Sequence, residues 1–109
     1  MNRGDVWLVE FNTSVGEEIQ KTRPAVIVSN DLSNKFLKRY QVVPLTSSSK
    51  TLYPGETHIS FKGKQGKAMV SQVTTVSKLR MLKRLGRLSD TELKNIDRGL
   101  SVQLGLRNK

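Results

Sequence analysis

The residues of this chain best suited to chemistry lie in the segment GEEIQKTRPAVIVSND, residues 16–31. Arg23 stands directly before Pro24 and a β-branched apolar run. Proline disfavours the helical conformation for the residue before it, so we expect Arg23 at a rigid strand entry. A guanidinium held in this way can bind a phosphate through two parallel hydrogen bonds. Two carboxylates, Glu17 and Glu18, lie a few residues upstream, in a polar segment that we expect to form a loop.

The rest of the sequence excludes several kinds of catalytic site. His58 is the single histidine, so a nuclease that uses one histidine as acid and another as base is excluded. We expect His58 at an ordinary strand position. The chain has no cysteine, its acidic residues show no metal-ligand spacing, and no glycine-rich phosphate loop precedes a helix. We therefore expect neither a metal site nor a cofactor.

The groups that remain are Arg23, the two glutamates and the hydroxyls of Thr46 and Ser47. They are sufficient for cleavage of RNA, because the 2′-OH of the substrate supplies the nucleophile. The protein then has to accept a proton from that hydroxyl, stabilise the charged phosphorane and protonate the leaving 5′ oxygen. DNA lacks the 2′-OH, so the same groups would do little on it. An ordinary strand-end arginine, paired with Glu18 or with solvent, is the alternative interpretation of Arg23.

Charge indicates the kind of partner. The chain carries 19 basic and 9 acidic residues, for a net charge of +10, and residues 57–88 contain no acid. Such a field attracts polyanions, so we expect nucleic acid, an acidic protein or both. A basic surface with no specific partner is the alternative. No apolar run has the length of a membrane span or of a signal peptide, which predicts a cytoplasmic protein without membrane contact.

The hydrophobic pattern predicts one domain over residues 1–109, mainly β, shaped as a small, partly open barrel. Alternation in DVWLVEF places Trp7, Val9 and Phe11 on one face of the first strand. We expect Pro44 at a strand end or edge, because it lacks an N–H. The predicted strands are 5–11, 25–30, 41–45, 57–61, 68–77 and a short one at 85–88; we expect a turn or short helix in 31–40, a turn at Pro54–Gly55 and a basic hairpin turn over 62–67.

The C-terminal segment has helical periodicity. Ser89 and Glu92 form a capping-box pattern, and apolar residues then recur at helical spacing as far as Leu104. Gly105 is typical of a helix stop. We expect this amphipathic helix to pack on the barrel through Leu93, Ile96, Leu100 and Leu104.

In combination, these motifs resemble the MazF/PemK (also called Kid) family of toxin endoribonucleases. The resemblance covers nearly the whole chain through RGDVWLVEFN, GEEIQKTRPAVIVSND, VVPLTSS, VSQVTTVSKLR and LGL. It implies an SH3-like barrel of five to seven short strands with a C-terminal amphipathic helix, assembled as a homodimer. It implies cleavage of single-stranded RNA (mRNA) at short sequences without metal, giving 2′,3′-cyclic phosphate and 5′-OH ends. The implied inhibitor is an antitoxin whose acidic tail occupies the RNA groove.

The resemblance also implies roles for individual residues. Arg23 and Thr46 match catalytic positions of the family, and Glu18 matches its loop glutamate. Ser71 stands where members commonly carry an acid, and a serine cannot take over the role of general base. We therefore leave the base open, with Glu18 as our choice. The residues expected to contact substrate are Glu17, Ser47, Ser71, Gln72, Lys78 and Arg80.

Two other functions stay open from the sequence: a gyrase-inhibiting toxin of the CcdB type and a non-catalytic RNA-binding regulator. The basic run KLRMLKRLGR (78–87) has two interpretations as well. It follows the RNA backbone, or it forms a solvated edge with Leu79, Leu82 and Leu85 buried. We expect a mixture of the two, with Lys78 and Arg80 nearer the RNA.

Overall fold

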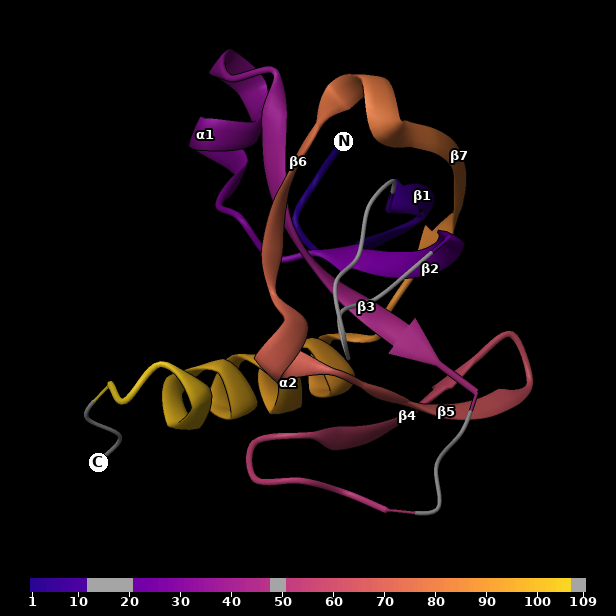
Figure 1. Ribbon diagram of the computed structural model, residues 1–109, viewed down its shortest axis with the longest axis vertical. Helices are drawn as coiled ribbons and strands as arrows, with labels where there is room; N and C mark the ends of the chain where they lie inside the picture. The colour runs from indigo at the N-terminus through magenta and orange to yellow at the C-terminus, as the bar shows by residue number, and fades with distance from the viewer. Residues whose placement is uncertain (12–20, 48–50, 107–109) are drawn as a thin grey trace.

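The structure is a computed structural model, and it describes residues 1–11, 21–47 and 51–106. Seven antiparallel strands form one curled sheet in the order β4-β5-β3-β2-β1-β7, and β6 pairs with β3 off this path (Figure 1). The strands are β1 (Asp5–Phe11), β2 (Lys21–Ile27), β3 (Arg39–Thr46), β4 (Thr57–Phe61), β5 (Lys64–Ala68), β6 (Thr74–Ser77) and β7 (Met81–Arg87). The helices are α1 (Asp31–Phe36) and α2 (Asp90–Gln103), and the 3₁₀ turns are η1 (Val70–Gln72) and η2 (Lys78–Arg80). The mainly β fold with a C-terminal helix is confirmed.

Each face of the central sheet carries its own core. As predicted, Trp7, Val9 and Phe11 point to one face of β1, where they join a cluster drawn from β1, β2, β3, β6 and β7. This barrel core contains Val9, Phe11, Ala25, Ile27, Tyr40, Val42, Val76 and Met81. The opposite face is covered by the β4–β5 hairpin, η1 and α2 (Figure 1). This outer core contains Val6, Val26, Val43, Leu45, Ile59, Ala68, Val70, Leu88 and Ile96.

The prediction of one long strand over 68–77 is wrong, because β3 changes partner along its length. Leu45 pairs with Ala68 of β5, whereas Val42 pairs with Thr74 of β6. Between these two pairs β3 advances by three residues, whereas the partner segment advances by six. The extra residues of the partner segment form η1. A continuous strand would have to keep one register throughout.

Pro44 was expected at a strand end or edge, and this prediction is wrong. It lies inside β3. It pairs with Ala25 of β2, and its carbonyl accepts a hydrogen bond of 2.9 Å from the N–H of Met69. The carbonyl and the nitrogen of one strand residue point to the same side. The proline nitrogen therefore faces the junction between β5 and β6, where no ladder partner needs an N–H.

The β4–β5 hairpin is tighter than predicted. Its turn consists of Lys62 and Gly63 alone, both with positive φ (51° and 79°), as a two-residue hairpin turn of the primed kind requires. The remaining residues of the expected turn, from Lys64 onward, belong to β5. The expected turn or short helix in 31–40 is confirmed as α1, which Asn30 caps by accepting from the Ser33 N–H.

Helix α2 begins as the capping box predicts. The Ser89 side chain accepts a hydrogen bond of 3.2 Å from the Glu92 N–H, and Gly105 follows the C-terminal end with a φ of 70°. Leu93 and Ile96 are buried in the interface with the barrel. Leu104 is 58% exposed, so its predicted packing is wrong: the helix extends past the sheet by its last turn.

The basic run at 78–87 forms η2 and β7, a longer strand than the one predicted at 85–88. Leu79 is 89% exposed and Leu82 is 50% exposed, so the prediction that these two are buried is wrong. Leu85 alone of the three leucines packs against the outer core. The cause is that β7 lies at the end of the sheet, where one edge and part of a face stay open.

A buried carboxylate joins the N-terminus to β7. Asp5 is 5% exposed, and its Oδ2 accepts a hydrogen bond of 2.9 Å from the Asn2 N–H. Its Oδ1 lies 3.3 Å from the Arg84 guanidinium and 3.6 Å from the Arg87 guanidinium. Burial raises the pKa of Asp5, but the Asn2 hydrogen bond and the two arginines outweigh it and hold that pKa below its ordinary value. Asp5 is therefore ionised and structural.

Candidate active site

Arg23 and Thr46 meet at the ends of two paired strands. Arg23 pairs with Val9 on one side, and on the other side β2 and β3 pair Ala25 with Pro44. The β2–β3 pairing ends there, but Arg23 lies two residues before Ala25 and Thr46 two residues after Pro44, so the alternation of each strand directs their side chains to one face. Both residues line the same cleft. The structure thus brings together the two residues that the sequence identified as catalytic.

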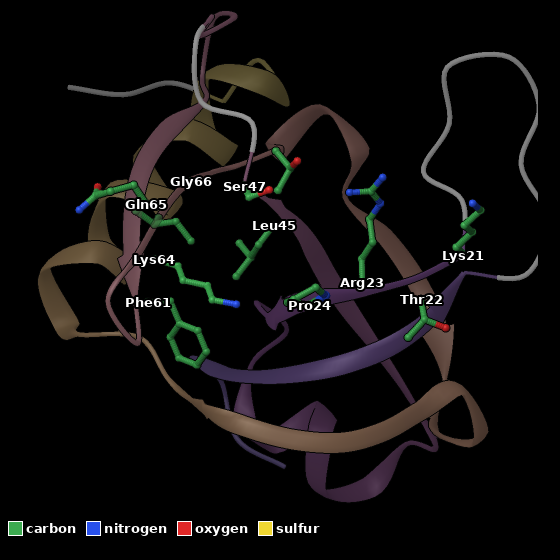
Figure 2. A pocket seen from close by; sticks show the side chains of 12 residues that line it. Lys21, Thr22, Arg23, Pro24, Leu45, Ser47, Phe61, Lys64, Gln65 and Gly66 are labelled. Carbon is green, nitrogen blue, oxygen red and sulfur yellow. The ribbon is translucent and has the colours of Figure 1, made fainter.

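A cleft of about 330 Å³ opens beside this pair, between β2, the end of β3 and the β4–β5 hairpin (Figure 2). Figure 2 shows Arg23 extending from β2 toward the end of β3, while Lys64 and Leu45 point into the hollow. The cleft is lined by Lys21, Thr22, Arg23, Pro24, Leu45, Thr46, Ser47, Ile59, Phe61, Lys64, Gln65 and Gly66. An apolar floor below three basic side chains suits a ligand with a flat apolar part and an anionic part.

The Nε of Arg23 is buried and has no hydrogen-bond partner among the described residues. A buried donor without a partner costs free energy, on the order of 1–3 kcal/mol, unless a ligand satisfies it. The side chain is half-buried at the mouth of the cleft, within reach of an incoming anion. A phosphate that accepts from this guanidinium would satisfy the orphaned donor.

Lys67 faces Thr46 on the neighbouring strand, and the sequence analysis did not identify Lys67 as part of the site. Thr46 pairs with Lys67 of β5, and Lys67 pairs with His58 of β4. The Lys67 Nζ lies 2.8 Å from Glu56 Oε1, and the two side chains are only 11% and 5% exposed. A signal was present in the sequence, because Glu56 is the single acidic residue between Asp31 and Asp90. His58 is exposed on its strand, as expected.

The other predicted substrate residues are spread over the molecule. Ser47 is exposed and lines the cleft. Ser71 and Gln72 lie in η1, which the bond from the Met69 N–H to the Pro44 carbonyl places beside the middle of β3. Glu17 and Glu18 lie outside the described residues.

Lys78 and Arg80 lie in η2, between β6 and β7, at the opposite end of the molecule from the β4–β5 hairpin (Figure 1). The Lys78 N–H donates to the Lys38 carbonyl, just before the start of β3 and so at the opposite end of that strand from Thr46. Arg80 leads into β7, whose first residue, Met81, faces Val9. Within one chain, therefore, Lys78 does not contact the cleft.

Across residues 1–11, 21–47 and 51–106, no group of three or more histidine, cysteine, aspartate or glutamate side chains could hold a metal ion together. Over the same residues, no helix has the length and apolar character needed to cross a membrane.

Comparison with known proteins decides the family. The model of the PemK-like, MazF-like toxins of type II toxin–antitoxin systems matches residues 2–104. The chain belongs to this family. Among curated MazF relatives, Endoribonuclease MazF9 of Mycobacterium tuberculosis is 36% identical over 97% of this chain and 98% of that protein. Endoribonuclease MazF of Staphylococcus epidermidis is 31% identical over 99% of this chain and 94% of that protein.

Solved structures agree on the MazF fold. MazF from Deinococcus radiodurans superposes with a TM-score of 0.85 at 23% identity and covers 97% of each chain. A mycobacterial endoribonuclease in complex with its cognate antitoxin superposes with a TM-score of 0.84 at 22% identity, over 100% of this chain and 99% of that one. The resemblance found in the sequence is thus confirmed at the level of family and fold.

Proposed function

We propose that this chain is the toxin of a type II toxin–antitoxin system and acts as a metal-independent endoribonuclease on single-stranded RNA. Membership of the MazF-like toxin family and two curated relatives named as endoribonucleases support this function. Cleavage of mRNA at short sequences would stop translation and growth. A toxin that acts on mRNA has to meet it where it is translated, so the proposal includes a cytoplasmic location.

The observation that carries the proposal is that Arg23 and Thr46 line one cleft together. Cleavage begins when the 2′-OH of one ribose attacks the adjacent phosphorus, and it ends when the 5′ oxygen of the next nucleotide leaves. Arg23 would bind the phosphorane through its guanidinium fork and deliver a proton toward the leaving oxygen, while the Thr46 hydroxyl adds a neutral hydrogen bond. The products would be a 2′,3′-cyclic phosphate and a 5′-OH.

The general base in this proposal is Glu18, with Glu17 beside it as a substrate contact. Both precede β2, which holds Arg23, so the chain leads directly from them to the cleft. Ser71 cannot accept the proton at neutral pH, and we assign Ser71, Gln72 and Ser47 to contacts with substrate. Lys78 and Arg80 would contact RNA that extends beyond one chain's cleft.

Charge and assembly complete the proposal. The net charge of +10 suits both RNA and an antitoxin with an acidic tail, which would compete for the same groove. A mycobacterial structural relative is described as an endoribonuclease in complex with its cognate antitoxin, which supports such a partner for this chain. We further propose that residues 1–109 form one toxin domain and that two copies assemble as a homodimer.

The test uses a long unstructured RNA in EDTA, cut by wild type, Arg23→Ala and Arg98→Ala in parallel. Arg98 is an exposed arginine on α2 and serves as the matched control for the loss of one positive charge. We expect discrete cuts with 5′-OH ends from wild type and Arg98→Ala. Arg23→Ala should lose at least about 100- to 1,000-fold in rate, the cost of removing one oxyanion donor. Cleavage by Arg23→Ala at the wild-type rate would refute the mechanism, and no cleavage by wild type would refute the function.

A further inference from the structure

The segment Tyr53–Pro54–Gly55–Glu56 forms a closed turn directly before β4. The Glu56 N–H donates to the Tyr53 carbonyl at 2.9 Å, and the Tyr53 N–H donates back to the Glu56 carboxylate at 2.9 Å. Pro54 occupies the second position and Gly55, with a φ of 86°, the third, which is the pattern of a type II turn. The turn that the sequence predicted at Pro54–Gly55 is therefore present, and its backbone is fixed by its own residues.

Lys67 and α2 fasten this turn to the rest of the molecule. The Lys67 Nζ bridges Glu56 Oε1 at 2.8 Å and the Thr51 carbonyl at 2.7 Å. On the other side, Gly55 packs so closely on Gly99 of α2 that a Cβ on Gly99 would overlap the Gly55 carbonyl oxygen. The turn is thus held by a strand of the sheet and by the C-terminal helix.

The Tyr53 side chain is largely exposed within the described part of the chain. The Lys67 Nζ lies over the ring, 5.1 Å from its centroid, yet Tyr53 is 63% exposed. An exposed aromatic ring on a fixed turn binds a flat partner with little further loss of conformational freedom. A nucleic acid carries flat bases on a chain of negative phosphates, and the net charge of +10 attracts that chain.

The position of the ring relative to the cleft follows from the strand register. Lys67 lies directly opposite Thr46 in the β3–β5 pair, and Thr46 lines the cleft together with Arg23. Neighbouring strands are about 4.8 Å apart, so Lys67, whose Nζ lies over the Tyr53 ring, is one strand away from the cleft residue Thr46. This spacing places the ring near the nucleotides that flank a phosphate held by Arg23.

We propose that Tyr53 is a base-stacking residue of the RNA site, and that the Lys67–Glu56 ion pair positions it. The proposal rests on the proposed function, because it concerns the RNA that this chain cleaves. The ring receives one base close to the cleaved phosphate. Every base has an aromatic face, so this subsite adds affinity and accepts bases of any identity.

The test is an abasic scan of a short RNA that contains the mapped cut site. A 2′-deoxy nucleotide at the cut blocks cleavage, and an abasic nucleotide is placed at each other position in turn. We expect wild type to lose roughly 5- to 150-fold in affinity when one position near the cut becomes abasic. Tyr53→Ala should show that loss on the intact RNA and be insensitive to an abasic nucleotide at that position, whereas Tyr53→Phe should behave as wild type.

Leu52→Ala is the matched control, because Leu52 is the adjacent residue and is also partly exposed, at 42%. If wild type cleaves RNA but Tyr53→Ala follows it at every abasic position, the stacking proposal is wrong and the proposed function stands. If Tyr53→Ala weakens only the binding of an acidic antitoxin-tail peptide, the ring belongs to a protein-binding surface and the proposal is also wrong. If wild type cleaves no RNA, both proposals fail together.

Discussion

Removing one member of the Lys67–Glu56 ion pair tests how much this buried pair contributes to the unfolding free energy. Glu56→Gln keeps the size of the side chain and the acceptor for the Tyr53 N–H, but it leaves the Lys67 ammonium buried at 11% exposure. Lys67→Met leaves the Glu56 carboxylate at 5% exposure, with the Tyr53 N–H as its hydrogen-bond donor. Each single change therefore creates a buried charge without its counter-charge.

The expected magnitude follows from this burial. Breaking a buried ion pair by removing one partner costs about 3–5 kcal/mol of unfolding free energy. Lys67 retains its 2.7 Å bond to the Thr51 carbonyl, so we expect Glu56→Gln near the lower end, at about 3 kcal/mol. The double variant carries no buried charge, so it should lose less than the sum of the single variants. A domain of this size has about 5–15 kcal/mol of stability, so the single variants should still fold.

Urea denaturation of wild type, the two single variants and the double variant measures the four unfolding free energies of this double-mutant cycle. The comparison requires the same slope m for all four proteins. Asp97→Asn is the control, because Asp97 pairs with Arg3 at a more exposed site, at 42% and 30% exposure, and should cost about 1 kcal/mol or less. Single variants that each lose less than about 1 kcal/mol, or a double variant that loses their full sum, would refute the reasoning.

Two further predictions concern stability. Because the pKa of Asp5 is lowered in the folded state, its contribution is present above the unfolded value, near 3.8, and is lost as the pH falls below it. Asp5→Asn should therefore be less stable than wild type in urea at pH 7, and the gap should shrink at pH 3; a constant gap would contradict the assignment. Gly99→Ala gains about 1 kcal/mol of helix propensity but forces α2 away from Gly55. We expect the unfolding free energy to fall by about 1–2 kcal/mol in the same assay. A rise would show that α2 can move away from Gly55 without loss of stability.

The sequence predicted best what depends on neighbouring residues. The capping box of Ser89 and Glu92 and the turn at Pro54–Gly55 are local patterns, and both are present. The alternation in the first strand also fixed which side of β1 faces the barrel core. Arg23 and Thr46 were found by chemistry and resemblance, and in the folded chain both line the same cleft.

What the sequence failed to predict depends on pairing between distant segments. The break in the strand at 68–77 arises because β3 pairs with two partners in different registers, which no local pattern encodes. Lys67 was read as part of a basic turn, because its partner Glu56 lies 11 residues away and is buried with it only in the folded sheet. Leu79 is exposed because it lies in the 3₁₀ turn η2, outside the strand that follows it.

Pro44 lies at the point where β3 changes its partner strand. On one side of it lie the residues that pair with β6 in the barrel, and on the other lie Leu45 and Thr46, which pair with the hairpin. At this point Pro44 donates no hydrogen bond to the β5–β6 side, and its carbonyl accepts one from the Met69 N–H there. The two proposed catalytic residues therefore belong to different ladders of the sheet: Arg23 pairs with β1, and Thr46 pairs with β5 of the hairpin. A change in the packing of the hairpin would reach Thr46 before it reached Arg23.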